Sequence, residues 1–294
     1  DSENFINTVK KSKATILGAG AKAFEHLHSK NLPVNKTYIK NLKSVLSTGS
    51  PLSDETFDFI NIKINKNIPI YSISGGTDIV SCFMLGNPMS PVYKGEIQSP
   101  GLGMDIDVFD EKGLPTNKTG ELVCKSPFPS KPIYFWNDKN NKKYKDAYFT
   151  KYKNIWSHGD FVKKTVNGGY RVFGRSDATL NPGGVRIGTA EIYNVLNSLD
   201  YIEDSLAVGL KDKNDEKILL FVKAVTPNIV TDNQILKIKK LIKDQLSPRH
   251  IPWKIYQVKD IPRTKSGKIS EIIVKQILNN DKISNLDALA NPES

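Results

Sequence analysis

Apolar and polar positions along residues 1–90 predict helices interleaved with short strands. Segments 4–12, 21–30 and 53–64 repeat apolar residues every three or four positions, which is typical of amphipathic helices, and Ser53 can cap the third. Apolar runs at 13–17, 41–50 and 68–78 predict strands, and two of them end in Gly-rich turns. This alternation favours a largely parallel sheet with functional residues at the strand C-terminal ends.

Residues 91–176 follow a different pattern, in which short strands are separated by Gly, Asn and Pro turns. The sequence VNGGY at 166–170 predicts a hairpin. We expect a small antiparallel barrel or a distorted sheet here.

A third pattern begins after residue 176. It predicts a helix at 189–199, strands at 204–210 and 218–225, a helix at 232–246, and a last helix after a loop. We therefore expect an α/β protein with a boundary near Ser176–Asp177. Residues 1–176 would form a larger domain, with a sheet subdomain at 1–90 and a β-rich subdomain at 91–176. Residues 177–294 would form a small α+β domain.

The charge balance does not by itself indicate a nucleic-acid partner. The net charge is +11, but the 42 basic residues include few arginines, the residue type that nucleic-acid recognition favours. These are Arg171, Arg175, Arg186, Arg249 and Arg263. Two cysteines, the absence of a long apolar run and the absence of a signal peptide predict a cytoplasmic protein without a membrane partner. The chain starts at Asp1 rather than Met, which favours a fragment or a processed piece.

The first Gly-rich segment, ILGAGAKAF, resembles a dinucleotide-binding turn at Gly18 and Gly20. Such a site also needs an acidic residue about twenty positions later to bind the ribose, and TYIKNLKSVL contains none. A tight turn near a ligand pocket is the better interpretation.

Two other Gly turns, STGSPLS and SGGTDI, each follow an apolar strand. Glycines there let the backbone approach a flat ring or a phosphate, and Thr77 and Asp78 add a hydroxyl group and a hard oxygen ligand suited to Mg²⁺. Together they favour a nucleotide site, although ordinary turns remain the alternative.

Three later segments carry further candidates. Asp160 in HGDF suits ribose hydroxyl groups, and GRSD offers Arg175, which suits ribose or phosphate oxygens, and Asp177; a structural ion pair among these residues is the alternative. In NPGGVRIG, adjacent glycines would let a narrow chain pass close to the backbone, while a flexible turn with a solvated Arg186 is the alternative.

The order of these segments resembles the adenylate-forming superfamily, which includes acyl-CoA synthetases, luciferases and peptide-synthetase adenylation domains. The resemblance spans the whole chain and rests on SGGTD, GEL at Gly120, HGD at His158, GRSD…GGVRIGTAEIY and IPRTKSGKIS at 261–270. Segments such as GNPMSPVYKGEIQSPGLGMDIDVFDEKG and SPFPSKP are most similar to the acetoacetyl-CoA synthetase subgroup.

The resemblance implies a role for each matched residue. Gly49, Ser50 and Pro51 would line the adenine on one side, and Ile73, Ser74, Gly75 and Gly76 would line it on the other. Thr77 would contact the α-phosphate, and Asp78 would hold Mg²⁺. Asp160 and Arg175 would bind the ribose, and Arg186 would approach the phosphate. Asp177 would be the hinge of the small domain, Gly184 would border the pantetheine tunnel of coenzyme A, and Lys268 would be the adenylation lysine. Arg263 and Lys265 would be ordinary loop charges.

The implied activity is AMP-forming ligation of acetoacetate to coenzyme A, with ATP, Mg²⁺ and coenzyme A as cofactors. Acetate-using relatives usually carry a bulky ring where this chain has Gly75, so Gly75 would leave room for a longer acid. The superfamily's Ser/Thr/Gly-rich phosphate loop does not occur in the sequence, which implies a C-terminal portion of the enzyme that is inactive alone. A ligase for another short acid such as acetate, propionate or a branched or keto acid remains an alternative, as does a non-catalytic nucleotide-binding fragment.

Overall fold

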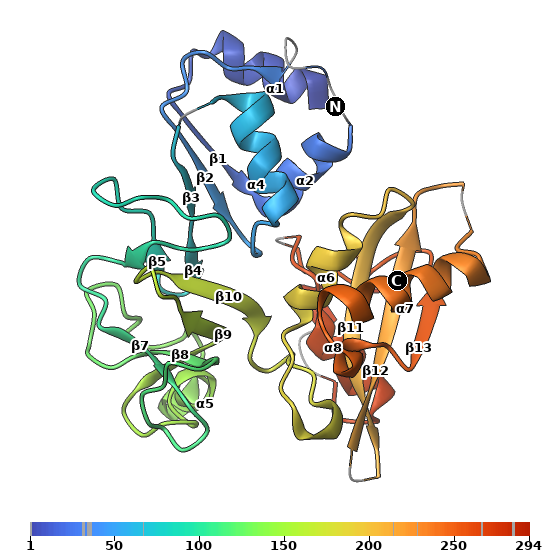
Figure 1. Ribbon diagram of the computed structural model, residues 1–294. Coiled ribbons are helices and arrows are strands. Elements are labelled where there is room, and N and C mark those ends of the chain that lie inside the picture. The colour runs from blue at the N-terminus through green and yellow to red at the C-terminus, as the bar shows by residue number, and fades with distance from the viewer. Residues whose placement is uncertain are drawn as a thin grey trace. The chain divides into compact units, whose positions relative to one another are not determined.

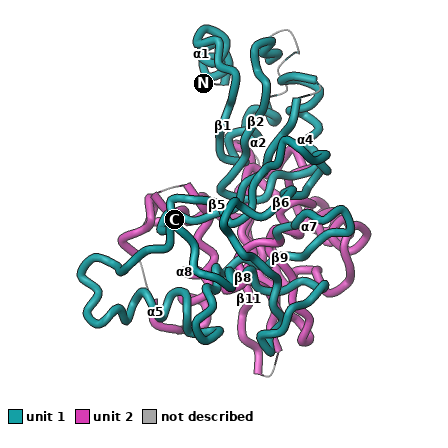
Figure 2. The backbone as a smooth tube through the Cα atoms, turned by 90° about the vertical axis from the view of Figure 1, so that its left-hand side faces the viewer, with its two compact units in different colours: residues 1–172 teal, residues 173–294 magenta. Residues whose placement is uncertain are grey.

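The computed structural model describes residues 2–30, 33, 37–66, 68–213, 215–227, 229–265, 267–283 and 286–294. They form two compact units, Asp1–Val172 and Phe173–Ser294 (Figures 1 and 2). The boundary expected from the sequence, near Ser176–Asp177, lies a few residues after this division. Each unit has its own apolar core. No helix within the described ranges is long and apolar enough to cross a membrane.

The first unit begins with a parallel three-stranded sheet in the order β1-β2-β3. Its strands are β1 (Ile16–Gly20), β2 (Ser44–Thr48) and β3 (Ile70–Ser72). Helices α1 (Ser2–Lys11), α2 (Ala21–Ser29) and α4 (Asp54–Phe59), the last continued by the π-helical turn η1 (Ile60–Ile64), lie beside the sheet (Figure 1). Phe24, Val45 and Ile60 are fully buried in this core, as the amphipathic pattern predicts. The expected cap is confirmed, because the Ser53 side chain accepts a hydrogen bond from the Thr56 amide.

The interpretation of Gly18 and Gly20 as a tight turn is wrong. Both lie within β1, where they pair with Leu46 and Thr48 of β2, and Gly20 is the N-cap of α2. The short strand expected at 13–17 instead spans Ile16–Gly20, because small residues still fit a strand that pairs in parallel with β2.

The rest of the first unit is antiparallel and forms two open sheets among the described residues, rather than a closed barrel. One sheet has the order β4-β5-β6, from β4 (Ser74–Gly76), β5 (Ser81–Leu85) and β6 (Ser99–Pro100). The other has the order β10-β9-β8-β7, from β7 (Ile106–Phe109), β8 (Gly120–Cys124), β9 (Trp156–Lys164) and β10 (Tyr170–Arg175). The predicted hairpin is confirmed between β9 and β10, where the Thr165 amide donates to the Gly169 carbonyl at 2.9 Å. The 3₁₀ turn η2 (Lys139–Asn141) and helix α5 (Lys142–Tyr148) precede β9.

The second unit contains an α+β fold around the sheet β11-β12-β13. Its strands are β11 (Ile202–Asp212), β12 (Asp215–Ala224) and β13 (Lys254–Gln257). Its helices are α6 (Thr189–Leu196), α7 (Asp232–Gln245) and α8 (Glu271–Leu278), with 3₁₀ turns η3 (Pro182–Gly184), η4 (Pro248–His250) and η5 (Leu286–Ala288).

Alternating strand residues give this sheet two buried faces. Ala207 and Leu220 pack in one cluster with α6 and α7, whereas Leu206 and Leu219 pack in another with residues of α8. Strand β13, which pairs in parallel with β12, was not anticipated from the sequence.

Candidate nucleotide-binding site

Two of the predicted loops lie side by side at the C-terminal edge of the parallel sheet. The Ile73 amide donates to the Ser47 carbonyl at 2.8 Å, and the Thr48 hydroxyl donates to the Ile73 carbonyl at 3.2 Å. Gly49 follows with φ +89, a conformation that favours glycine, and turns the chain into Ser50 and Pro51. The segments expected to face the adenine from two sides are thus joined at their bases.

Strand β9 brings Asp160 to the same loop. Asp160 is 9% exposed, and its Oδ2 accepts a hydrogen bond of 2.8 Å from the Ser74 hydroxyl. Two residues earlier on the same strand, His158 Nε2 lies 3.1 Å from the Gly75 carbonyl oxygen. Positions 158 and 160 face the same side of β9, so one strand contacts two consecutive residues of the Gly-rich loop. The sequence had suggested Asp160, but not that Ser74 would be its partner.

Gly75 does not open onto free space in the direction of a side chain. A Cβ atom there would stand 2.1 Å from the Ser81 carbonyl oxygen and 2.8 Å from Cys82 Cα, both in the backbone of β5. A Cβ on Gly76 would meet the His158 ring at 3.0 Å. The argument that Gly75 leaves room for a longer acid is therefore wrong for this direction, because β5 fills it. The assignment of Gly75 to an acyl pocket stays a prediction.

Thr77 and Asp78 follow β4 and are exposed. The Tyr148 hydroxyl donates to Asp78 Oδ2, and the Tyr148 ring stacks on buried Trp156 with ring centroids 3.6 Å apart. Asp78 is thus tethered to the aromatic core through one carboxylate oxygen.

This environment fits Mg²⁺ in one specific way. The described residues contain no group of three or more His, Cys, Asp or Glu that could hold a metal ion. Mg²⁺ is commonly bound by one or two carboxylates together with waters and substrate phosphates, so a single exposed Asp78 suffices only when a nucleotide supplies the other oxygens.

The remaining predicted residues belong to the second unit, and two of them pair with each other. Arg175 Nε lies 3.3 Å from Asp177 Oδ1, and Arg175 Nη2 lies 3.2 Å from Asp177 Oδ2. Both side chains are 45% exposed, so solvent weakens the pair. The structural ion pair weighed for the sequence GRSD is therefore present.

Gly184 ends the turn η3, and Arg186 follows two residues later. The turn is fixed on both sides of Gly183, whose amide donates to Asp215 Oδ1 at 2.6 Å and whose carbonyl accepts from Arg249 Nη1 at 3.2 Å. Gly184 has φ +74, and a Cβ there would meet nothing within 4 Å. Arg186 is exposed. The space beside Gly184 in the direction of a side chain is thus open, and the passage of a narrow ligand chain there stays a prediction.

Lys268 sits at the end of a tight hydrogen-bonded turn. The Gly267 amide donates to the Thr264 carbonyl at 2.7 Å, the Thr264 amide donates to the Lys268 carbonyl at 2.8 Å, and the Lys268 amide donates to the Thr264 hydroxyl at 3.1 Å. Gly267 has φ +82, which only glycine adopts readily. The Lys268 side chain is exposed, and among the described residues its ammonium group forms no ion pair.

The expectation that Arg263 is an ordinary loop charge is wrong. Its guanidinium group pairs with buried Asp204 of β11 and also donates to the Gly267 carbonyl at 2.6 Å. The composition of the chain could have indicated this role of Arg263, because arginine is rare in this chain and its guanidinium group can bind two acceptors at once.

A buried acidic side chain, Glu271, lies three residues after the lysine turn (residues 264–268). Glu271 begins α8 and accepts hydrogen bonds from the Tyr193 hydroxyl at 3.2 Å and the Thr189 hydroxyl at 3.4 Å. Burial raises the pKa of Glu271 above its ordinary value, and burial likewise raises the pKa of Tyr193 well above its ordinary value. No sequence pattern indicated this cluster.

Comparisons with known proteins point to one group. Over 95% of its length the chain is 47% identical to the acetoacetyl-coenzyme A synthetase of Rhizobium meliloti and 43% identical to the acetoacetyl-CoA synthetase of Gallus gallus, and each match covers 43% of the relative. The acetoacetyl-CoA synthetase of Caenorhabditis elegans is 44% identical over 100% of the chain and is likewise covered to 43%. The chain thus spans less than half of the length of these relatives. No protein-family model matches it.

Solved structures agree with these relatives. The acetoacetyl-CoA synthetase of Streptomyces lividans superposes with a TM-score of 0.84 at 34% identity, covering 99% of this chain and 46% of that one. An anthranilate CoA ligase in complex with anthranoyl-AMP superposes with a TM-score of 0.80 over 95% of this chain and 52% of that one. At 18% identity this second likeness shows the fold alone.

Proposed function

Because the chain is homologous to the acetoacetyl-CoA synthetases over 95% of its length, we propose that it is part of an enzyme that ligates acetoacetate to coenzyme A with ATP. The single observation that carries the proposal is this identity of 42–47% to relatives that share one name. The geometry of the strand-end loops supports it, because those loops suit a nucleotide.

In the first unit, the edge of the parallel sheet would hold the nucleotide. Gly49 to Pro51 and Ile73 to Gly76 would flank the adenine, which is supported by the hydrogen bonds that join the two loops at their bases. Asp160 would bind the ribose, exchanging its bond to Ser74 for the ribose hydroxyl groups. Thr77 would contact the α-phosphate, and Asp78 would ligate Mg²⁺, which would neutralise phosphate charge when bound.

In the second unit, Lys268 would supply the mobile cation for the adenylation step. A lysine suits this role because it is a compact charge on a long stem, and its ammonium group is not committed to an ion pair among the described residues. Arg175 would bind the ribose and Arg186 would approach the phosphate. Asp177 would be the hinge, and Gly184 would border the pantetheine tunnel, which the open backbone there supports.

The reaction has two steps. An acetoacetate carboxylate oxygen attacks the α-phosphorus of ATP and expels pyrophosphate, forming acetoacetyl-adenylate. The thiolate of coenzyme A then attacks the acyl carbonyl carbon, and AMP leaves with the electrons of the broken bond. Such chemistry depends on positioning and on charge neutralisation, and we propose that Lys268 acts in the first step and not in the second. We also propose that the reaction takes place in the cytoplasm.

The test is a half-reaction assay on the protein in its full natural length. Acid-dependent exchange of pyrophosphate into ATP measures adenylation, and thioester formation from supplied acetoacetyl-adenylate measures the second step. We expect Lys268→Ala to lower the first about 10²–10³-fold and to spare the second, whereas the matched variant Lys265→Ala changes neither.

Competition among acids tests the substrate. Acetoacetate should give the highest kcat/KM, and a higher value for acetate, propionate or a branched acid would replace acetoacetate as the substrate. Nucleotide binding without any acid-dependent exchange would instead favour a non-catalytic nucleotide-binding role.

A further inference from the structure

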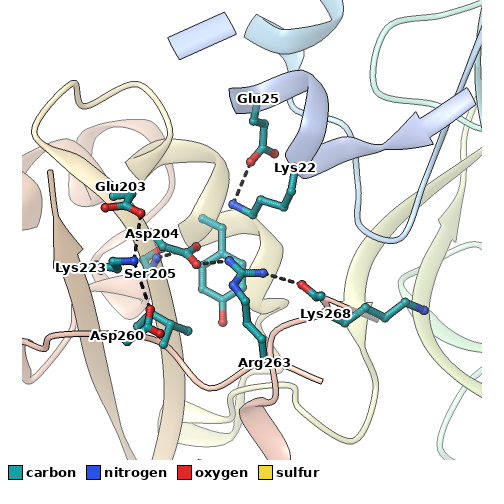
Figure 3. Close-up of polar contacts among 12 residues, drawn as sticks. Lys22, Glu25, Glu203, Asp204, Ser205, Lys223, Asp260, Arg263 and Lys268 are labelled. Carbon is teal, nitrogen blue, oxygen red and sulfur yellow. Dashed lines mark hydrogen bonds and ion pairs between the residues drawn. The ribbon is translucent and has the colours of Figure 1, made fainter. Parts of the chain in front are cut away.

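The lysine turn is held by Arg263, whose two terminal guanidinium nitrogens bind different partners. Arg263 Nη2 pairs with Asp204 Oδ2, and Arg263 Nη1 donates to the Gly267 carbonyl oxygen at 2.6 Å (Figure 3). Gly267 immediately precedes Lys268, whose side chain extends away from the guanidinium group (Figure 3). The arginine therefore links the turn that presents Lys268 to the sheet of the same unit.

Asp204 is a firm anchor. It lies on β11 beside a register irregularity, its side chain is 8% exposed, and its Oδ1 accepts a hydrogen bond of 3.0 Å from the Ser205 amide. Such a carboxylate is held by its own strand and does not follow the loop. Beside Asp204, Lys223 forms ion pairs with Glu203 and Asp260, and these stabilise the same end of β11 (Figure 3).

The backbone on the other side of the turn is held by the last residues of the chain. The Lys265 amide donates to the Ala288 carbonyl at 2.9 Å, and the Ala290 amide donates to the Arg263 carbonyl at 2.8 Å. These bonds fix the entry into the turn. Gly267, where the chain reverses, has its carbonyl bound by Arg263.

We propose that Arg263, held by Asp204, is a positioning residue that sets the place of Lys268 for adenylation. This rests on the proposed function, in which Lys268 supplies the cation. A planar guanidinium group can bind a carboxylate and a carbonyl at the same time, whereas an ammonium group on a lysine stem is a single point charge. Loss of one of the two contacts frees the turn, and a displacement of about 1 Å is enough to slow a reaction about 10²-fold.

The test uses Arg263→Lys, which keeps the charge, and Asp204→Asn, which keeps the shape, in the protein at its full natural length. We expect each variant to lower adenylation about 10- to 100-fold and to leave thioester formation from supplied acetoacetyl-adenylate within about twofold. The double variant should lose no more than the worse single variant, because both changes break one link. Lys265→Met is the matched control, since its side chain is exposed and makes no hydrogen bond or ion pair with the residues that the structure describes, and it should retain both half-reactions.

A second readout does not depend on activity. Amide hydrogen exchange at Thr264 and Lys268 should become about tenfold faster in Arg263→Lys, with no change in the β11 and β12 amides. A merely structural role would instead lower the melting temperature and slow both half-reactions together.

The outcomes separate this inference from the proposed function. If the wild-type protein adenylates no acid, the proposed function fails, and the exchange measurement alone decides whether Arg263 holds the turn. If adenylation is present but unchanged in Arg263→Lys, or if exchange in the turn is unchanged, the positioning role is overturned. Equal loss of both half-reactions with a lower melting temperature would overturn it too.

Discussion

Adding one methyl group at Gly75 tests the geometry of the candidate site most directly. A Cβ there would stand 2.1 Å from the Ser81 carbonyl oxygen and 2.8 Å from Cys82 Cα, and neither backbone atom can rotate away as a side chain can. Gly75→Ala must therefore part β4 from β5, which pair at Gly75–Cys82 and Gly76–Ser81. Overpacking of this kind costs about 1–3 kcal/mol.

The loss of stability can be measured as a decrease in the melting temperature of the first unit. For a unit of this size, 1 kcal/mol shifts the melting temperature by about 2–4 °C, so we expect a decrease of about 2–12 °C. Trp156 is 2% exposed in the core of this unit, whereas Trp136 is 84% exposed and Trp253 of the second unit is 45% exposed, so Trp156 should give the largest change in tryptophan emission on unfolding. Gly18→Ala is the matched control. A Cβ there meets only Leu46 Cβ at 3.7 Å, so the change should be neutral or stabilise by up to about 1 kcal/mol.

Equal melting temperatures for Gly75→Ala and the wild type would refute the pairing of β4 with β5 described above. A decrease has a consequence for acid specificity. Placing a large ring at Gly75 would disturb the strand pair before it could shorten a pocket, so a change in acid preference at this position is interpretable only beside a stability measurement.

Three further predictions address the second unit and the proposed Mg²⁺ site. Burial raises the pKa of Glu271 above its ordinary value of 4.5. The stability that the protonated Glu271 side chain contributes is therefore present below pH 4.5 and is lost as the pH rises through the raised pKa. Glu271→Gln should melt at a higher temperature than the wild type at pH 8 and at no higher temperature at pH 4. Thr231→Ala should cost about 1 kcal/mol, because the Thr231 side chain caps α7, while Ser270→Ala should cost under about 0.5 kcal/mol because Ser270 makes no side-chain cap bond; equal losses in urea unfolding would contradict this. Tyr148→Phe removes the hydroxyl group that donates to Asp78. The Mg²⁺ concentration that gives half-maximal adenylation should therefore change by about two- to tenfold. An unchanged Mg²⁺ concentration would argue against Asp78 as the ligand.

The fold was predictable where local chemistry decides the conformation. Ser53 caps α4, and the VNGGY turn joins β9 to β10, because capping and hairpin signals act within a few residues. Strand β13 was missed because its four residues carry no clear alternation and are stabilised by pairing with β12, some 35 positions earlier in register. Gly18 and Gly20 were placed in a turn because their context in the sheet is equally non-local.

The candidate site shows the same division. The loops after β2 and β3 could be expected to meet, because parallel strands end at one edge of a sheet. The partners of individual side chains could not. Ser74 meets Asp160 across 86 positions, and Arg263 meets Asp204 across 59. Only the folded chain brings these pairs together.

The last residues of the chain have a practical importance that their position conceals. Thr264 and Leu289 form a bridge, and Asn291 accepts from the Arg263 amide at 2.8 Å while donating to Asp260 Oδ2 at 2.8 Å. This segment therefore supports the lysine turn from the side opposite to Gly267. Removing residues 286–291 would keep every side chain proposed to contact a ligand, and would still remove the hydrogen bonds that hold the backbone of the turn before Lys268.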